Sequence, residues 1–530
     1  MSASIETTRR RITRPDMQAD AVVIGAGISG LVAATVLAAA GAKVVVLERD
    51  AKAGGLAGRF SRRYAPGAFT HAVGATLGAG LQPGGVLDVV LRKVGAKVSY
   101  HTLDPIMRVH LSDRDVTVVG TWPAWHAELA RAFPGQDKRK LDFWKNLTRI
   151  ARVLDRVAAR FPGQPFTSLP DTLQAIRAFE PALLTVLPAM LGTVGGSLQR
   201  YGVNDPALTT FMDGQLLDSL QTTSENAVLA NGALALDLYR FGAQYVPGGL
   251  ASIADALAAR LKALGGVILQ GRRAREIVIE RGQVKGVRAD RFYAAPVVVS
   301  SAGVLETAAL APTLGVSSRH REAANSMWSA FTLYLAVSEK VLPQGWLPFE
   351  QITESENGRL RFNGLVSTSL HGDLARAPEG YRSITMSVHE ASAVWRDLNP
   401  QAYQGRKEAM TASMLSRLSQ LAPNLNEGLI GLEAGTPRTF KAFTLHEGGH
   451  AGGFQQTPSN ANFGAVPTRT NIQGLFLAGE TTFPGAGLPG VTVSGFNAAR
   501  AGLLHLRAPR GLTRRSALSN PASAELEVSA

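Results

Sequence analysis

The sequence predicts an α/β protein: a Rossmann-type nucleotide-binding domain with an inserted mixed α+β domain and a helical segment. Three observations predict this fold. A β-branched run at 21–24, a glycine-rich turn, an Ala-rich helical stretch and a strand-like run at 43–47 follow one another. Strand-like and glycine-rich segments return at 241–312 and 436–506. The stretches between them mix helical and strand-like patterns without an internal repeat, so the nucleotide-binding domain is expected to be discontinuous.

The first turn carries the dinucleotide fingerprint Gly-x-Gly-x-x-Gly in its required βαβ setting. Gly25 permits the tight turn, Gly27 lets the backbone approach a pyrophosphate, and Gly30 lets helix and strand pack closely. Glu48 ends the second strand, where a carboxylate accepts hydrogen bonds from a ribose. The alternative is a glycine-containing turn in an ordinary α/β domain. The cofactor contacts expected from this unit are Gly25, Gly27, Ile28, Ser29, Gly30 and Glu48.

Two later motifs favour FAD over NAD. A glycine doublet, Gly54-Gly55, follows the acid closely, and the strand-like run at 471–480 ends in a Gly-acid pair. The doublet resembles the second motif, and the Gly-acid pair the final motif, of the FAD-binding amine-oxidase and carotenoid-desaturase superfamily. In that family the glycines pass close to the cofactor, and the acid hydrogen-bonds its ribityl or pyrophosphate region. The contacts implied by this resemblance are Arg49, Gly54, Gly55, Leu56, Arg59, Gly479 and Glu480.

The closing stretch narrows the resemblance. Residues 479–495 hold a Pro-Gly turn and a helix start expected near Gly490 and Val491, as in bacterial carotenoid desaturases and isomerases. A helix start there would stabilise the negative charge of a reduced flavin. The loops 69–85 and 436–453 resemble those of cyanobacterial-type C-3',4' carotenoid desaturases. The further contacts implied are Gly74, Ala75 and Thr76 in the first loop, and Ala274 against the adenine.

The chain departs from the family pattern at two positions. Leu56 stands where an Arg often follows the glycine doublet, a position that varies among isomerase-like and C-3',4' members. Ala72 stands where the family usually has an acid, so no role for that acid is carried over.

The pattern of elements predicts the organisation of the chain. The expected parts are a disordered basic arm at 1–19, a discontinuous FAD-binding domain at 20–100, 241–312 and 436–506, a substrate domain with a helical subdomain at 101–240 and 313–435, and a disordered tail at 507–530. We expect strands at 267–270, 275–280, 284–288, 297–300, 331–337 and 383–389, and helices at 142–160, 173–191, 250–264 and 403–421.

Composition limits the chemistry of the site. The sequence has no Cys, which excludes disulfides, thiolate metal sites, a Cys nucleophile and a cysteinyl-flavin bond. We expect FAD to be bound non-covalently. The net charge of +14 is compatible with nucleic-acid binding, with a merely solvated surface or with attraction to anionic lipid. No nucleic-acid module is evident, so no such partner is expected. His446 and His450 flank a glycine pair that does not favour a helix, so we predict no metal site there.

The resemblance implies an oxidoreductase that introduces a C=C bond into a carotenoid, of the C-3',4' type, by hydride transfer to flavin N5. A polyene stabilises developing charge itself, so the protein mainly positions the substrate and excludes water. No catalytic residue stands out, and the electron acceptor, quinone or oxygen, stays open. The polar residues expected near the ring or the tunnel mouth are Arg59, His71, His446, Glu447 and His450. The alternatives are a poly-cis-carotene isomerase, a phytoene desaturase, a flavin amine oxidase and a flavin-binding scaffold protein.

A carotenoid has to be drawn from a bilayer, so we expect a cytoplasmic protein held peripherally on the membrane surface. No secretory signal is evident, and glycines and Lys43 interrupt the apolar run at 21–47. The membrane contact is expected at the apolar stretch 179–191, for which ordinary domain core is the alternative. Basic residues close in sequence, each worth about 1 kcal/mol near anionic headgroups, are Arg149, Arg152, Arg156 and Arg160.

Overall fold

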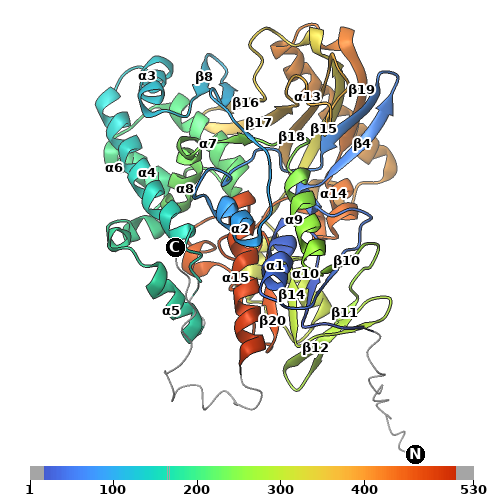
Figure 1. The fold of residues 1–530 in the computed structure, drawn as a ribbon. Helices are drawn as coiled ribbons and strands as arrows, with labels where there is room; N and C mark the ends of the chain where they lie inside the picture. Colours follow the sequence, from blue (N-terminus) through green and yellow to red (C-terminus); the bar gives the residue numbers. More distant parts are fainter. Residues whose placement is uncertain (1–16, 164, 166–167, 509–530) are drawn as a thin grey trace, which may run out of the picture.

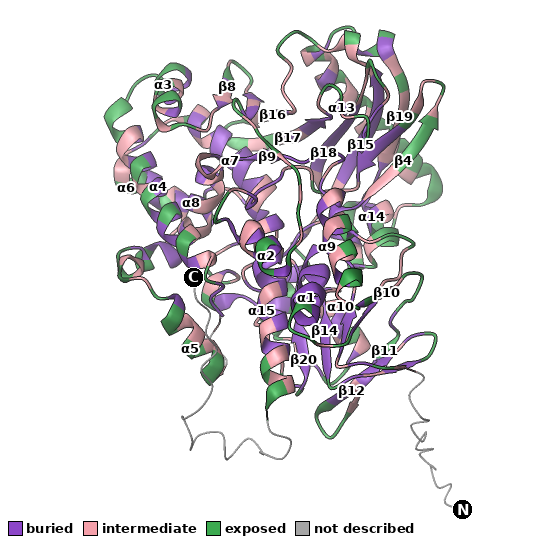
Figure 2. Ribbon diagram, in the orientation of Figure 1, coloured by how far each residue is buried: buried purple, intermediate pink, exposed green. Residues whose placement is uncertain are grey.

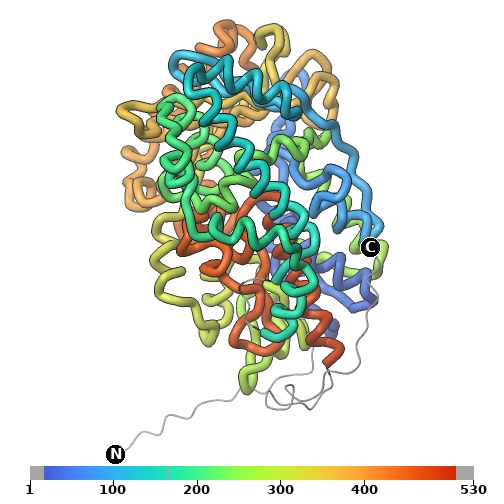
Figure 3. Tube along the Cα trace, turned by 90° about the vertical axis from the view of Figure 1, so that its left-hand side faces the viewer, coloured from blue at the N-terminus to red at the C-terminus, as the bar shows by residue number. Residues whose placement is uncertain are grey.

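The computed structural model describes residues 17–163, 165 and 168–508, and it confirms the α/β fold class. The nucleotide-binding half lies at the bottom of Figure 1, a second sheet at the upper right and a group of helices at the upper left. Figure 3 shows that these helices run along one side of the molecule, from the second sheet down to the nucleotide-binding half. The predicted disordered arm and tail fall mainly on 1–16 and 509–530, outside the described residues.

The nucleotide-binding half is built on a five-stranded parallel sheet. Its strands, in spatial order, are β10 (Val267–Leu269), β3 (Val44–Leu47), β2 (Ala21–Ile24), β14 (Val297–Ser300) and β20 (Leu475–Leu477). Successive side chains of β2 and β3 enter two different hydrophobic clusters, one on each face of the sheet. Both strands are buried throughout, which explains why their sequences are apolar without alternation.

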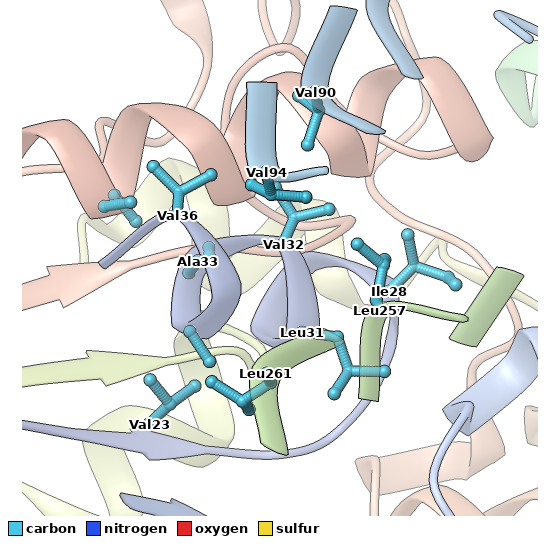
Figure 4. Packing of buried hydrophobic residues seen from close by; sticks show 14 of the residues in the cluster. Val23, Ile28, Leu31, Val32, Ala33, Val36, Val90, Val94, Leu257 and Leu261 are labelled. Carbon is cyan, nitrogen blue, oxygen red and sulfur yellow. The ribbon is translucent and has the colours of Figure 1, made fainter. Parts of the chain in front are cut away.

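Four helices pack on one face of this sheet: α1 (Ile28–Ala39), α2 (Val86–Val94), α9 (Ala251–Ala263) and α15 (Leu488–Arg507). Helix α1 lies among the others, so it is buried on nearly every side and its sequence is Ala-rich. In Figure 4, Val32 of α1 lies beside Val94 of α2, and Leu31 lies near Leu261 of α9. The predicted helix at 250–264 and strand at 297–300 are confirmed.

The other face is covered by a four-stranded sheet in the order β1 (Met17–Gln18), β13 (Phe292–Ala294), β12 (Gln283–Arg288) and β11 (Glu276–Glu280). Strand β1 corrects the expectation that the disordered arm extends to residue 19. Met17 and Gln18 pair in parallel with Tyr293 and Ala294, and these backbone hydrogen bonds hold this part of the arm in place.

The second sheet has seven strands, in the order β19 (Leu429–Gly435), β15 (Trp328–Ser338), β18 (Tyr381–Ala391), β17 (Arg359–Thr368), β16 (Phe349–Glu356), β7 (Met107–His110) and β8 (Asp115–Val118). All neighbours are antiparallel except β16 and β7. Helix α13 (Pro400–Leu421) packs on β15 through a shared apolar cluster. The strands expected at 331–337 and 383–389 are confirmed and are longer than predicted. Strands β7 and β8 lie within 101–240, where no strand was among those expected.

The helical group comprises α3 (Trp122–Ala132), α4 (Asp137–Ala158), α5 (Leu169–Ala178), α6 (Val194–Tyr201), α7 (Pro206–Leu220) and α8 (Leu229–Asp237). The helix expected at 173–191 is wrong in its second half. Helix α5 ends at Ala178, and two 3-10 turns follow, η2 (Pro181–Thr185) and η3 (Leu187–Met190). Pro181 and Pro188 lack the N–H that an α-helix interior needs, which explains the break.

The remaining elements connect these layers. The strands are β4 (Arg59–Tyr64) and β5 (Gly67–Ala72), which form a hairpin, and β6 (His101–Thr102), which pairs with β9 (Gln244–Tyr245). The helices are α10 (Val304–Leu310), α11 (Ser318–Ala324), α12 (Ala393–Arg396) and α14 (Pro437–Thr444), with 3-10 turns η1 (Gly55–Ala57), η4 (Leu238–Phe241), η5 (Glu339–Val341), η6 (Leu425–Gly428), η7 (Glu447–Gly449) and η8 (Asn462–Gly464).

Candidate active site

A cavity of about 1240 Å³ joins the nucleotide-binding half to the second sheet and the helical group. Its wall has two parts. One part, which we term the cradle, is formed by the glycine-rich turns at 25–30 and 54–59, the loop 74–76 and the segment 480–491. The other, which we term the substrate wall, is formed by residues of α4, α7, α8, η4, β15, β17 and β18. A ligand held in the cradle would therefore face the substrate wall.

The turn between β2 and α1 leaves room for a phosphate group. Gly25 has a φ of +94°, and a Cβ on Gly30 would lie 2.1 Å from the carbonyl oxygen of Gly25, so both positions need glycine. Gly27 is different: a Cβ there would meet no protein atom within 4 Å, and the residue lines the cavity. The space in front of Gly27 lies at the N-terminus of α1, which favours an anion such as pyrophosphate.

Glu48 is fixed against this turn. Its Oε2 accepts a hydrogen bond from the backbone N–H of Ala26 at 2.7 Å, and its Oε1 accepts one from Asp50 at 2.8 Å. Burial raises the pKa of Glu48, although these two backbone donors oppose the shift. Each carboxylate oxygen keeps further acceptor capacity, and the residue lines the cavity, as a ribose-binding acid would.

The glycine doublet brings the second turn against the first. Gly54 has a φ of +127°, and a Cβ on Gly55 would lie 3.3 Å from the Cα of Gly27. Leu56, the departure from the family pattern, accepts a hydrogen bond from the N–H of Ala75 through its carbonyl oxygen. The Leu side chain at this position therefore leaves the backbone link between the doublet and the loop 74–76 intact.

The last part of the cradle is acidic and ends at a helix. Glu480 lines the cavity, and its Oε1 is buried without a hydrogen-bond partner among the described residues. His446 Nε2 lies 3.6 Å from that oxygen. Helix α15 begins at Leu488, with Pro489 in its first turn, so it starts two residues earlier than expected. An acceptor without a donor and a helix N-terminus both suit the hydroxyl groups and the ring of FAD, so the residues present fit this cofactor.

Nearly all the predicted cofactor contacts come together here. Those that line the cavity are Gly25, Gly27, Ile28, Ser29, Glu48, Arg49, Gly54, Gly55, Leu56, Arg59, Gly74, Ala75, Thr76, Ala274, Glu480, Gly490 and Val491. Gly30 and Gly479 do not line it. Gly30 allows close packing beneath the turn, and Gly479 has a φ of +112° and donates its N–H to Ser494 Oγ. Contact with the cofactor itself stays a prediction for all of them.

The polar residues expected near the ring divide into two groups. Arg59 and His446 line the cavity, whereas His71, Glu447 and His450 are not among its lining residues. His71 is buried beside Phe60 and Tyr334, and burial together with the charge of Arg376 lowers its pKa to about 3. Burial lowers the pKa of His450 to about 4. Both histidines are therefore neutral parts of the protein interior.

The substrate wall carries a polar cluster that the sequence did not reveal. Asp218 and Gln221, at the end of α7, face His389 of β18 inside the cavity. Gln221 and His389 are 168 residues apart in the chain, and no motif spans them. Only the packing of α7 on the second sheet brings these side chains together, so a single sequence offers no signal for them. Within 17–163, 165 and 168–508, no three His, Asp or Glu side chains gather as metal ligands.

Known proteins resemble the chain over most of its length. A family model described as flavin containing amine oxidoreductase matches residues 28–501. Prolycopene isomerase 2, a chloroplastic protein of an Oncidium hybrid cultivar, is 28% identical over 493 residues, covering 90% of this chain and 82% of the relative. The zeta-carotene-forming phytoene desaturase of Myxococcus xanthus is 26% identical over 506 residues, covering 89% and 92%. A crystal structure of an oxidoreductase from Methanosarcina mazei shares the fold, with a TM-score of 0.59 and 20% identity over 91% of this chain and 100% of that one.

Proposed function

This chain belongs to the flavin-containing amine oxidoreductase family, and from that premise we propose that it is a carotenoid desaturase of the C-3',4' type. The protein is an FAD-dependent oxidoreductase, and the prediction of FAD from the glycine and Gly-acid motifs is confirmed. Bound FAD supplies the hydride acceptor. The chain's own residues hold it: Gly27 leaves space for the pyrophosphate, while Glu48 and Glu480 offer acceptors to its hydroxyl groups.

The observation that supports a long substrate is the continuity of the cavity. Its volume exceeds the range of about 300–1000 Å³ that is usual for small-molecule pockets, which suits a site that takes a dinucleotide and a long chain together. The part of its wall formed by the helical group is mainly apolar; examples are Leu154, Val157, Met190, Leu234 and Leu238. An apolar wall favours a hydrocarbon polyene and excludes water from it.

A cis–trans carotenoid isomerase is the second candidate. The observation that favours it is the name of a relative, prolycopene isomerase, which covers 90% of this chain. Such an enzyme would use reduced flavin without net oxidation of the substrate. The cradle and the cavity suit both reactions, because each needs a polyene beside the flavin. The C-3',4' assignment rests on the loops 69–85 and 436–453, which resemble desaturases of that type.

Pigment analysis separates the candidates. The gene is expressed separately in hosts that accumulate lycopene, poly-cis-lycopene or phytoene, the carotenoids are resolved by HPLC, and the purified protein is assayed for amine oxidation. A product with longer conjugation supports the desaturase. A changed cis–trans pattern alone supports the isomerase, conversion of phytoene alone supports a phytoene desaturase, and oxidation of amines alone supports an amine oxidase. A Gly27→Val variant, expected to lack FAD, is the matched control.

We also propose that the protein docks peripherally on a membrane through an apolar ridge beside the cavity. The ridge consists of exposed residues of α5 and of the turns that follow it: Leu169, Leu173, Ile176, Phe179, Leu184, Leu187 and Leu191. Figure 2 shows α5 as an outlying, mainly exposed or half-buried helix. Met190 lines the cavity, and its neighbour Leu191 is 74% exposed. The ridge therefore adjoins the inside of the cavity, where a lipid-soluble substrate would enter.

The stretch 179–191 is thus partly core and partly surface. Val186 and Met190 are buried in the core of the helical group, whereas Leu184 is 60% exposed. Two of the basic residues nearby have partners within the protein. Arg156 forms an ion pair with Glu180 at 2.5 Å, and Arg149 donates to the hydroxyl of Thr185. No helix among the described residues is long and apolar enough to cross a membrane.

Liposome co-sedimentation tests the docking proposal. The triple substitution Leu184→Ser, Leu187→Ser and Leu191→Ser removes roughly 1 kcal/mol of apolar insertion per residue, so partitioning should fall about 100-fold. Leu374→Ser, at an exposed leucine elsewhere on the surface, is the control and should leave partitioning unchanged. Equal, negligible binding of the wild type to neutral and anionic liposomes would exclude membrane docking and leave the enzyme assignment intact.

A further inference from the structure

One carboxyl group of the substrate wall is held by neutral donors only. Asp218, in the last turn of α7, accepts a hydrogen bond from Asn363 Nδ2 at 2.9 Å and one from Gln351 Nε2 at 2.7 Å. These two amides belong to β17 and β16, so the second sheet fixes the carboxyl group of a residue in the helical group. Asp218 also lines the cavity. Its remaining acceptor capacity therefore faces the space that a substrate would fill.

His389 of β18 completes the arrangement. The amide nitrogen of Gln221 lies 3.2 Å from its Nε2, and its Nδ1 lies 3.4 Å from Asp218 Oδ1. Because an amide nitrogen can only donate, ring Nε2 accepts and the proton of the neutral ring lies on Nδ1, toward Asp218. Burial lowers the pKa of His389 to about 4, so the ring stays neutral and adds no positive charge.

Burial without a cation favours the protonated carboxyl group. The titratable groups of the described chain that face Asp218 are His389 of β18 and Tyr239 of η4, while β16 and β17 present neutral amides. Burial raises the pKa of Asp218 to about 7, against the effect of the two amide donors. A carboxyl group with such a pKa exchanges a proton readily at neutral pH, as general acid–base catalysis requires.

The other carboxyl groups that line the cavity are placed differently. Glu48, Glu306 and Glu480 belong to the cradle or lie beside it, and Asp50 beside Glu48 is paired with Arg49 at 2.8 Å. Asp155 of α4 lines the cavity as well; burial raises its pKa, but the adjacent charge of Arg156 opposes this shift. Asp218 is the one that combines a place in the substrate wall, fixed side-chain donors and no adjacent cation.

We propose that Asp218 is the proton acceptor of this enzyme and that His389 is a positioning residue for it. The inference rests on the proposed desaturation. A hydride leaves one carbon of the polyene for FAD, which is thereby reduced, and the C–H bond of the neighbouring carbon breaks. The electron pair of that bond forms the new C=C bond, and the proton moves to the carboxylate of Asp218. The proton then leaves to solvent, and an external acceptor of the quinone or oxygen class reoxidises the flavin.

The test compares Asp218→Asn with Asp213→Asn. Asp213 is a buried acid of the same helix that accepts the N–H of Ser224 and is not a lining residue of the cavity. Purified holoenzyme is mixed anaerobically with detergent-dispersed lycopene, and flavin bleaching is followed across pH 5.5–9. FAD content and lycopene binding are measured on every sample, so a merely structural defect is recognised. His389→Gln serves as a second variant.

Asp218→Asn should slow bleaching about 100- to 1000-fold, the usual worth of a general base, with FAD content and lycopene binding unchanged. The wild-type rate should rise with pH through neutrality, because the acceptor must be ionised, and this limb should be absent from Asp218→Asn. Asp213→Asn should keep the wild-type bleaching rate and its rise with pH. His389→Gln should shift the pH at which the rate rises and lower the rate about tenfold. A wild-type pH profile and rate in Asp218→Asn would overturn the inference while leaving the desaturase standing. If carotenoid does not bleach the flavin of the wild type, the proposed desaturation is overturned, and the proton transfer with it.

Discussion

The two parts of the cavity wall differ in the atoms that shape them. The cradle is shaped mainly by backbone: at Gly25, Gly27 and Gly55 the absence of a side chain allows the tight turns and leaves space for a ligand. The substrate wall is made of side chains, such as Asp218 and His389, that come from distant segments and hold one another. A backbone site depends on a few contiguous residues and can be recognised in a sequence. A side-chain site depends on packing and becomes visible only when the chain is folded.

The largest expected effect concerns the helical group, where a buried ion pair stands in the core. Arg240 and Asp237 are almost completely buried, with Nε and Oδ1 3.3 Å apart, and the guanidinium lies 4.6 Å from the ring centroid of Trp125. Arg240→Ala leaves the carboxyl group of Asp237 buried without its partner, so we expect a loss of about 3–5 kcal/mol in the free energy of unfolding. Thermal and urea unfolding of the apoprotein measure it.

The double variant Asp237→Leu with Arg240→Met is the control for this prediction. Replacing both partners by apolar side chains of similar size should restore most of the lost stability, because no buried charge then lacks a partner. If the single and double variants were equally unstable, the cost would come from lost packing on Trp125 instead of from the charge.

The second effect concerns the cradle. Gly27→Val places a side chain in open cavity space without touching protein atoms at Cβ, so the apoprotein should keep its stability. The same side chain takes the place of the pyrophosphate, and we expect FAD affinity to fall by about 3 kcal/mol or more, over 100-fold. Fluorescence titration of the apoprotein with FAD measures the affinity. Gly30→Ala should instead lower the stability of the apoprotein, because its Cβ would meet the backbone of Gly25.

The third effect concerns Glu48, a side chain beside the cradle. Glu48→Ala removes an acceptor for the ribose and for two backbone N–H groups, so FAD affinity should fall by about 1.5–3 kcal/mol. Glu48→Gln keeps one acceptor oxygen and should lose less. Unchanged affinity in both variants would assign Glu48 to loop structure alone.

The smallest effect is an acid sensitivity in the β4–β5 hairpin, where His71 packs against the second sheet. The pKa of His71 in the folded protein, about 3, lies below its ordinary value near 6.5, so only the unfolded chain takes up a proton as pH falls. The contribution of neutral His71 to the free energy of unfolding is fully present above pH 6.5 and is lost as the pH falls toward 3. Between pH 6.5 and 5 the loss is about 2 kcal/mol. His71→Gln should reduce the difference in unfolding free energy between these two pH values. An unchanged difference would assign the sensitivity to other buried groups, such as His389 and His450.

The sequence predicted what local patterns determine. The β-branched run at 21–24, the glycine turn and Glu48 need only nearby residues to take up their roles, and they lie as expected. The helix expected through 173–191 was only half correct, because Pro181 and Pro188 end it and the periodicity alone could not show which leucines face outward. The polar cluster of the substrate wall could not be predicted, since its members meet only through the packing of α7 on β16, β17 and β18.

The order of strands in the five-stranded sheet has a consequence for biosynthesis. Strand β2 pairs with β14, and the hydroxyl of Ser301 bonds the carbonyl of Ile24, 277 residues away. A ribosome releases the glycine turn early, yet the neighbours that bury it, β14, β20 and α15, emerge much later. Contacts of such long sequence separation form slowly, because a long loop must close first. The apolar faces of β2 and α1 therefore stay uncovered for most of translation, a period in which chaperones would have to shield them.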